Sequence, residues 1–420
     1  MNSPRATRAP TRDTAAMRRR TQRRYAAERR FRRLGLAAIW LSAGFLAFLL
    51  ATMLWQGTSG FRQTRIALPI DLAAAHLRVT PAQLKGDGVT RALADAGLER
   101  AVDAAAVRAY GPQGAGLLSD GAWQVVRDAI RRDPALLGRR VTLAVPVASA
   151  FDVAAKNDGS PRAEATVARL QAQGVLSTGW SVGFLGHADA TDPTRVGIWG
   201  AFKGSLLTMA VTLGLAFPIG VFAALYLEEY APRNRWTDLI EVSINNLAAV
   251  PSIIFGLLGL AVFLNTFHLP RSAPLVGGLT LALMTMPVIV IAGRNAIKAV
   301  PPSIRDAALA VGASPVQVVF DHVLPLALPG ILTGTIIGMA RALGETAPLL
   351  MIGMRAFIAA PPSRLTDPAT VLPVQIFLWS DEVDRGFVEK TSAAIIVLLV
   401  FLLAMNGLAI YLRNRFETRW

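Results

Sequence analysis

Residues 301–325 read PPSIRDAALAVGASPVQVVFDHVLP and separate two long apolar blocks of the chain. The composition of 303–311 favours a short helix, and Pro315 suits the first turn of a second helix over 315–322. Gly312 lies between these two segments, at the point where the chain must turn. The stretch therefore predicts a compact helical hairpin that connects two membrane-spanning helices.

Apolar blocks of about 20 residues are the dominant pattern on both sides of this hairpin, since a helix of that length crosses about 30 Å of hydrocarbon. Of the 420 residues, 53% are hydrophobic. The sequence predicts an all-α polytopic membrane protein with six spans, at residues 34–55, 200–227, 240–264, 274–297, 326–354 and 392–412.

The formal net charge of +15 is concentrated near the N-terminus, where residues 1–33 contain twelve arginines. A basic segment next to a span is typical of a cytoplasmic flank. We therefore predict that both termini, including 413–420, are cytoplasmic and that 56–199 lies outside the membrane. Nucleic-acid binding is a weaker alternative, because no interleaved aromatic pattern accompanies the arginines.

The segment 56–199 differs in composition from the spans and predicts a small folded periplasmic domain, α-rich or α+β. Short amphipathic helices broken at Gly and Pro are expected in it, and RRVTLAVPVASAF (139–151) alternates as a strand does. A loosely ordered loop is the alternative, since its apolar content is modest.

Small residues and prolines punctuate the spans. Gly330, Gly334 and Gly338 recur every four residues and therefore share one helix face, which lets a neighbouring helix approach closely. Pro251 falls inside the third predicted span, where it would interrupt the helical hydrogen bonds.

The predicted hairpin resembles the coupling loop of ABC importer permeases, in which Glu-Ala-Ala is followed by Gly and then by Ile-x-Leu-Pro at fixed spacings. The matching residues are Asp306, Ala307, Ala308, Gly312, His322, Leu324 and Pro325. Aspartate replaces glutamate and histidine replaces isoleucine in this pattern. The resemblance implies that the loop 301–325 contacts an ATPase, and the two small alanines would let the first helix seat deeply against it.

Residues 197–411 resemble the PstA-type permeases of phosphate ABC importers, within the binding-protein-dependent transport system inner membrane component family. The similar stretches include NNLAAVPSIIFGLLGLAVF (245–263) and HVLPLALPGILTGTIIGMARALGETAPLL (322–350). The resemblance implies a type I ABC importer permease fold for 200–412, located in the bacterial inner membrane. It also implies that the chain forms half of a phosphate translocation pathway.

The same resemblance implies partners: a second, PstC-like permease forming a heterodimer, two PstB-like ATPase subunits and a PstS-like periplasmic phosphate-binding protein. The chain contains no G-x-x-x-x-G-K-[ST] motif, so ATP must be hydrolysed by a partner. We therefore predict a non-catalytic subunit that binds no cofactor.

Arg341 and Glu345 are four residues apart within the fifth predicted span and so face the same way on a helix. A charge at the centre of a span costs about 2.5–3.5 kcal/mol, and a planar guanidinium matches phosphate oxygens two at a time. The carboxylate can accept a hydrogen bond from protonated phosphate, which sulfate cannot donate. An internal salt bridge that fixes a helix kink is the alternative reading of this pair.

Other polar residues of the spans give weaker signals. The predicted substrate path comprises Arg341, Glu345, Thr346, Asn245, Asn246 and Ser252. The asparagines and the serine equally suit helix–helix hydrogen bonds. Arg294 and Lys298 can reach the inner membrane surface and are assigned no site. The four histidines lack ligand spacing, so no metal site is predicted.

Two rival functions stay open at this point. The chain could transport another oxyanion, such as sulfate or molybdate, because the coupling loop does not distinguish them. It could also be a phosphate-sensing or signalling subunit with 56–199 as its input domain.

Overall fold

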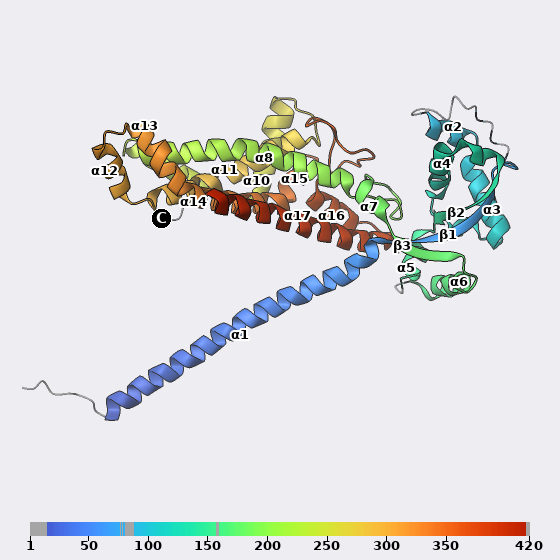
Figure 1. Cartoon of the computed structure of the whole chain (residues 1–420), viewed down its shortest axis with the longest axis horizontal. Coiled ribbons are helices and arrows are strands. Elements are labelled where there is room, and N and C mark those ends of the chain that lie inside the picture. Colours follow the sequence, from blue (N-terminus) through green and yellow to red (C-terminus); the bar gives the residue numbers. More distant parts are fainter. Residues whose placement is uncertain (1–14, 76, 78, 80–87, 157–158, 417–420) are drawn as a thin grey trace, which may run out of the picture. The chain divides into compact units, whose positions relative to one another are not determined.

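The computed structural model describes residues 15–75, 77, 79, 88–156 and 159–416 (Figure 1). It divides into two compact units, Met1–Trp55 and Gln56–Trp420, which we describe separately. Three predicted segments lie outside the described residues: 1–14 of the basic tail, 80–87 of the insert, and 417–420 of the C-terminal tail.

The first unit is occupied by helix α1 (Ala15–Gly60), which continues into the second unit. Its residues Arg23–Gly60 form a candidate membrane span. Apolar side chains are exposed around the helix, with Trp40 75% and Trp55 85% accessible. A helix that is apolar all round is typical of a membrane-spanning segment.

A three-stranded antiparallel sheet organises the first part of the second unit. Its order is β2 (Arg140–Pro146), β1 (Arg62–Asp71) and β3 (Leu176–Trp180), so β1 is central. The register places Ile66 opposite Val145. This central strand was not predicted, although its burial alternates along the sequence RQTRIALPID as expected for a strand with one face inward.

Among the described residues, six α-helices and two 3-10 turns surround or follow this sheet. The helices are α2 (Val89–Asp95), α3 (Leu98–Tyr110), α4 (Ala122–Arg132), α5 (Ser149–Ala154), α6 (Pro161–Ala172) and α7 (Val182–Gly186), and the turns are Ala115–Leu117 and Pro134–Gly138. Ile66, Leu68 and Ile70 of β1 pack in one core with Val102 of α3 and Ile130 of α4, all nearly inaccessible. The prediction of a folded α+β insert is confirmed, and the alternative of a loosely ordered loop is wrong.

The helical core follows the insert. Its elements are α8 (Trp199–Leu225), α9 (Arg235–Ala248), α10 (Ser252–Gly259), α11 (Pro274–Lys298), α12 (Pro302–Ala310), α13 (Pro315–Gln317), α14 (Leu324–Gly344), α15 (Ala347–Met351), α16 (Leu372–Ser380) and α17 (Gly386–Phe416). Turns of π-helix extend three of them, at Tyr226–Tyr230, Leu260–Thr266 and Val318–Val323. Five described helices are long and apolar enough to cross a membrane, and a bent pair would make a sixth.

Helices α8, α11 and α14 pack closely because glycines face their neighbours. A Cβ added at Gly334 of α14 would lie 2.0 Å from the Cβ of Ala292 in α11, and one at Gly338 would lie 2.9 Å from Thr285. On the other side of α11, a Cβ at Gly278 would lie 2.4 Å from Val211 of α8. The predicted small-residue face of α14 is therefore a helix–helix contact.

Two predicted spans are not continuous. The third, 240–264, is divided between α9 and α10, whose axes meet at 100°. Pro251 immediately precedes α10 with an extended ψ of 136°; it lacks an N–H and disfavours a helical residue before it. The fifth, 326–354, ends at Gly344, because Glu345 adopts an extended conformation before α15 begins at Ala347.

Buried polar contacts join the insert to the last helix of the core. The Lys156 Nζ lies 2.8 Å from Asp152 in α5 and 2.7 Å from Glu389 in α17. Lys390 donates a hydrogen bond of 2.6 Å to the carbonyl of Gly60. Removal of one partner would leave the other charge buried and uncompensated, so it would strongly destabilise this junction.

Candidate functional site

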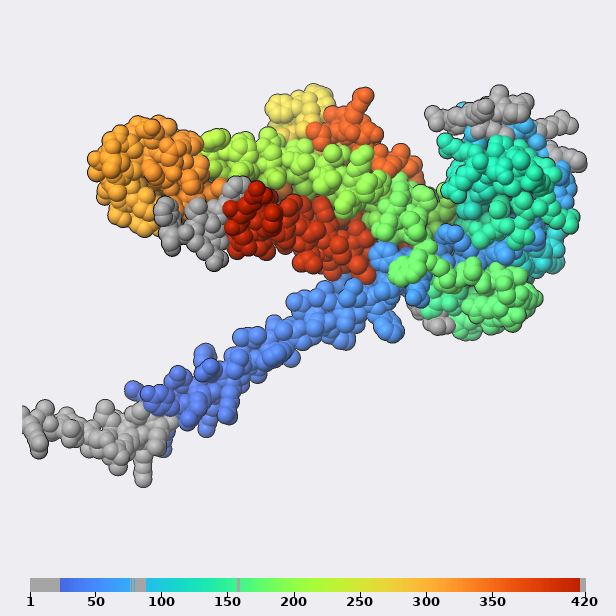
Figure 2. Space-filling model, in the orientation of Figure 1, coloured from blue at the N-terminus to red at the C-terminus, as the bar shows by residue number. Residues whose placement is uncertain are grey.

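The predicted hairpin is present and is formed by α12, α13 and the π-turn that follows. Gly312 has φ of +92°, a conformation that glycine adopts without steric cost. Ser314 and Gln317 form a reciprocal capping box that starts the second helix. In Figure 2 the orange hairpin protrudes from one end of the neighbouring core helices.

The hairpin shares an apolar cluster with the ends of the neighbouring core helices. Ala308 is 6% exposed and packs in one cluster with Val318, Val319 and Val323. In the single chain Ala308 is therefore not accessible to another protein, whereas Ala307 is exposed. That the small alanines let the first helix seat deeply against an ATPase stays a prediction.

The outer surface of the hairpin combines polar and apolar groups. Asp306 and Ala307 are exposed, whereas Leu324 and Pro325 are half-buried where α14 begins. Near the turn, Val311 is 85% exposed, an unusual position for a large apolar side chain. The other exposed apolar side chains of the hairpin are Leu309, Val316 and Phe320. Several large apolar side chains exposed on one short hairpin suit a protein contact surface.

An ion pair that the sequence analysis missed ties the hairpin to the core. The Arg305 Nη2 lies 2.7 Å from the Glu229 Oε1 at the end of α8, and the Arg305 Nε also donates to this carboxylate. Its Nη1 and Nη2 donate to the carbonyls of Val300 and Ile297, at 2.7 and 3.0 Å. One guanidinium thus connects α12, α8 and the end of α11.

A second, more buried cluster lies beside it. The Arg294 Nε is 2.5 Å from the Glu228 Oε1, and its Nη2 is 2.6 Å from the Glu241 Oε2 in α9. Lys298 adds a 3.4 Å contact to Glu228. Arg294 is 7% exposed, so its guanidinium lies inside the protein and does not extend along the surface as expected. The position of Arg294 inside a predicted span could have indicated these ion pairs, because intramembrane charges normally have a partner.

The predicted substrate-path residues lie on α9, at the start of α10, at the end of α14 and just before α15. Arg341 is on the last turn of α14 with its side chain 47% exposed, and its Nε is 3.5 Å from the Glu345 Oε1. Within the part of the chain that the structure describes, Glu345 is the ion-pair partner of Arg341. Glu345 lies beyond the end of the helix, so the pair spans a helix end rather than two turns of one helix.

The remaining path candidates are less closely connected. Thr346 directly precedes α15 and Ser252 begins α10, and these two short helices pack on each other through Gly256 and Pro348. Asn245 and Asn246 are exposed near the end of α9. The structure brings Ser252 and Thr346 onto contacting elements. Among the described residues, neither asparagine side chain forms a hydrogen bond with Arg341, whose ionic partner is Glu345.

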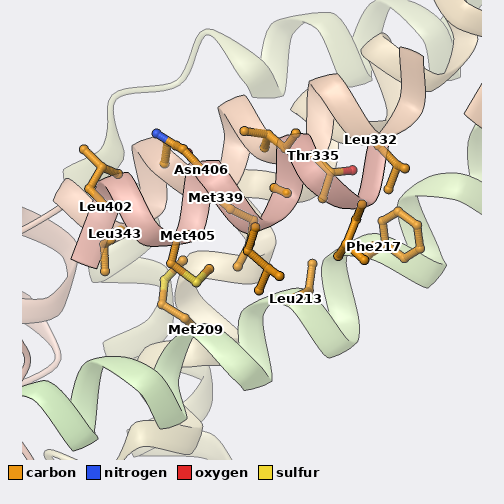
Figure 3. Close-up of a pocket in the computed structure, with 15 residues that line it drawn as sticks. Met209, Leu213, Phe217, Leu332, Thr335, Met339, Leu343, Leu402, Met405 and Asn406 are labelled. Atoms are coloured by element: carbon orange, nitrogen blue, oxygen red, sulfur yellow. The ribbon is translucent and has the colours of Figure 1, made fainter. Parts of the chain in front are cut away.

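A groove between α8, α14 and α17 has a volume of about 240 Å³ and is lined almost entirely by apolar side chains (Figure 3). Met209, Leu213, Met339 and Met405 point toward one another there, and Thr335 is one of its few polar groups. Such a lining suits a lipid tail or an apolar helix, so we do not assign the groove to an oxyanion.

Two family models match the chain. The binding-protein-dependent transport system inner membrane component matches residues 216–418, and a domain of unknown function (DUF3333) matches residues 18–165. A solved structure of the methionine ABC transporter MetNI, in inward-facing conformations, aligns with a TM-score of 0.43 at 18% identity. That alignment covers 53% of this chain and 98% of the MetNI chain.

Curated relatives are similar over the helical core. The chain is 31% identical over 229 residues to the probable ABC transporter permease protein YqgI of Bacillus subtilis, covering 50% of this chain and 77% of YqgI. It is 32% identical over 211 residues to the phosphate transport system permease protein PstA of Haemophilus influenzae. That alignment covers 50% of this chain and 73% of the Haemophilus protein. With PstA 1 of Mycobacterium tuberculosis the identity is 35% over 156 residues, and the alignment spans about half of that relative (51%).

Proposed function

Because the chain belongs to the family of binding-protein-dependent transport system inner membrane components, we propose that it is the permease subunit of an ATP-driven phosphate importer. The observation that carries this proposal is the similarity to the Haemophilus PstA permease along the helical core. As a member of this family, the chain is a non-catalytic multi-pass subunit of the inner membrane. It acts together with an ATPase, a second permease and a substrate-binding protein.

The proposed partners are those of a phosphate system: a PstC-like permease, two PstB-like ATPases and a PstS-like binding protein. The exposed apolar residues near the hairpin turn, with Asp306 and Ala307, suit the ATPase contact. In this arrangement both termini and the hairpin are cytoplasmic, and the sheet-containing insert is periplasmic. The arginines of α1 before the first apolar block support this orientation.

Movement of the ATPase would reach the spans through the two ionic clusters. Arg305 is bound to Glu229 at the end of α8, to the Ile297 carbonyl in the last turn of α11 and to the Val300 carbonyl just after it. Arg294 connects α11 with the end of α8 and the middle of α9. Since packed helices have few intermediate arrangements, displacement of α12 would shift these three spans together.

The anion would meet the Arg341–Glu345 pair. The 47% exposure of Arg341 in the single chain leaves its guanidinium open to a second permease or to a passing anion. Glu345, 19% exposed, can accept a hydrogen bond from monohydrogen or dihydrogen phosphate and would repel fully ionised sulfate. Thr346 and Ser252 would supply hydroxyl groups along the same route.

Reconstitution of the whole complex tests the proposal. Purified chain, second permease and ATPase are incorporated into liposomes, and radiolabelled anion uptake is measured with ATP and the binding protein supplied on opposite sides. ATP-dependent uptake of phosphate that excess sulfate does not inhibit is expected. Uptake of sulfate or molybdate in preference to phosphate would refute the substrate assignment.

A further inference from the structure

The insert contains a basic cavity that the permease function does not use. Its volume is about 460 Å³, and it lies between β1, α4, β2 and the segment from α7 to Arg195. Its lining includes four arginines (Arg65, Arg127, Arg132 and Arg195) and one carboxylate, Asp128. We call this cavity the arginine cleft. Sites for small molecules have volumes of about 300–1,000 Å³, so the cleft is large enough to hold one.

The four arginines are not equally available to a ligand. Arg127 is engaged, with its Nη2 2.7 Å from Asp128 and its guanidinium over the Trp123 ring. Arg65 donates to Gln63 at 3.3 Å. Among the described residues, no carboxylate lies within ion-pair distance of the Arg132 or Arg195 guanidinium.

Arg195 packs closely against the start of α4. It is half-buried, and its side chain lies so close to Gly121 that an added Cβ there would be 1.7 Å from its Cδ. Burial and the nearby positive charge of Arg127 lower the pKa of Arg195, and Asp192 and Asp128 oppose this only in part. The guanidinium stays protonated at neutral pH because its ordinary pKa is far higher. The cleft therefore contains a partly desolvated cation without a paired anion.

We propose that the arginine cleft binds a tetrahedral oxyanion, either free phosphate or the phosphoryl group of a small monoester, with Arg195 as its principal ligand. A guanidinium presents a planar fork of N–H donors that matches two oxygens of such a group. Arg132 supplies a second positive charge at the rim, and the half-buried Gln124 and buried Ser181 of the same lining provide neutral polar groups. A protruding acidic segment of a partner protein would be less well suited, because the guanidinium is recessed.

The cleft would give the insert a ligand-binding role separate from translocation. The choice of phosphate as the first probe rests on the proposed function, whereas the site itself requires only an oxyanion. Sulfate is therefore tested in parallel. Binding of sulfate alone would leave the cleft supported and would count against the phosphate assignment, which anion uptake by the whole complex tests independently.

Equilibrium dialysis of the full chain in lipid nanodiscs, with radiolabelled phosphate or sulfate and with glycerol phosphate as competitor, measures this binding. Arg195→Gln should weaken the affinity about 10- to 100-fold, as expected for the loss of a charged, two-point hydrogen bond. Arg195→Lys should lose less, because it keeps the charge without the fork. Arg108→Gln, which removes the same charge from α3 outside the cleft, is the matched control and should bind as the wild type does.

Gly121→Ala provides a second test, because it displaces the Arg195 side chain without changing the charge of the cleft. It should reduce the affinity in a protein that still elutes as a monodisperse species. Unchanged affinity in both Arg195→Gln and Gly121→Ala would overturn the proposal. Binding that persists in these variants and disappears in Arg341→Gln would also overturn it. The same holds if the chain binds no anion but captures the substrate-binding protein in a way that depends on Arg195.

Discussion

Replacement of Arg305 by glutamine should loosen the hairpin without unfolding the spans. The side chains of Arg305 and Glu229 are 23% and 11% exposed. An exposed ion pair contributes about 0–1 kcal/mol, and removal of one partner from a buried pair costs about 3–5 kcal/mol. Because exposure is low and two carbonyl contacts are also lost, we expect this substitution to lower the free energy of hairpin opening by about 3 kcal/mol. That corresponds to a roughly 100-fold larger population of the open hairpin.

Amide hydrogen exchange over 303–323 measures that change directly in the purified chain. The hairpin amides of Arg305→Gln should exchange up to roughly 100-fold faster than those of the wild type, because local opening sets their rate. In the reconstituted complex, ATP hydrolysis should continue while the phosphate transported per ATP falls. Arg233→Gln, at an exposed arginine of the loop before α9, is the control and should change neither quantity.

Exchange of the two charges separates the ion pair from the carbonyl contacts. Arg305→Glu combined with Glu229→Arg restores opposite charges, but the new carboxylate cannot donate to the carbonyls of Val300 and Ile297. The double variant should therefore recover only part of the lost protection. If Arg305→Gln leaves both hairpin exchange and the transport ratio at wild-type values, the inference that this arginine transmits motion is refuted.

Three further predictions concern other parts of the chain. Arg341→Gln should abolish phosphate uptake in a complex that still assembles, and reversal of the pair with Glu345 should restore assembly only; normal uptake in either variant would contradict the proposed path. Gly334→Val should prevent stable packing of α14 on Ala292 of α11 and lower the yield of assembled complex, measured by co-purification; wild-type yield would contradict the close contact. Asp189, whose pKa is raised from 3.8 by burial, binds more protons folded than unfolded, so its contribution to stability falls as pH rises above about 4. Asp189→Asn should therefore raise the melting temperature at neutral pH and have little effect near pH 4. A gain in melting temperature that becomes larger at acidic pH would contradict a raised pKa of Asp189.

The spans and the hairpin could be predicted because both are encoded in local sequence. Long apolar runs predict spans through the length of helix that crosses a bilayer, and Gly312 with Pro315 predicts the turn. The 100° bend between α9 and α10 could not be obtained in this way. Pro251 marks its position, but a proline in a span is compatible with either a kink or a full break.

The ionic clusters were missed for a different reason. Glu228 and Arg294 are separated by 66 residues, so only the packing of α8 on α11 brings them together. Arg341 and Glu345 could be paired from the sequence because they are four residues apart, although the helix they were assigned to ends between them. Strand β1 directly follows an apolar helix, and its alternating pattern was obscured by that neighbouring signal.

The burial of Ala308 within the single chain affects the order in which the transporter assembles. Because Ala308 is already buried in the single chain, in one apolar cluster with valines of the second limb, the hairpin is packed before any nucleotide-binding subunit arrives. Little backbone entropy is then lost on encounter, which favours rapid and reversible association. The membrane half can accordingly be inserted and completed first, and the soluble half can be added or exchanged afterwards.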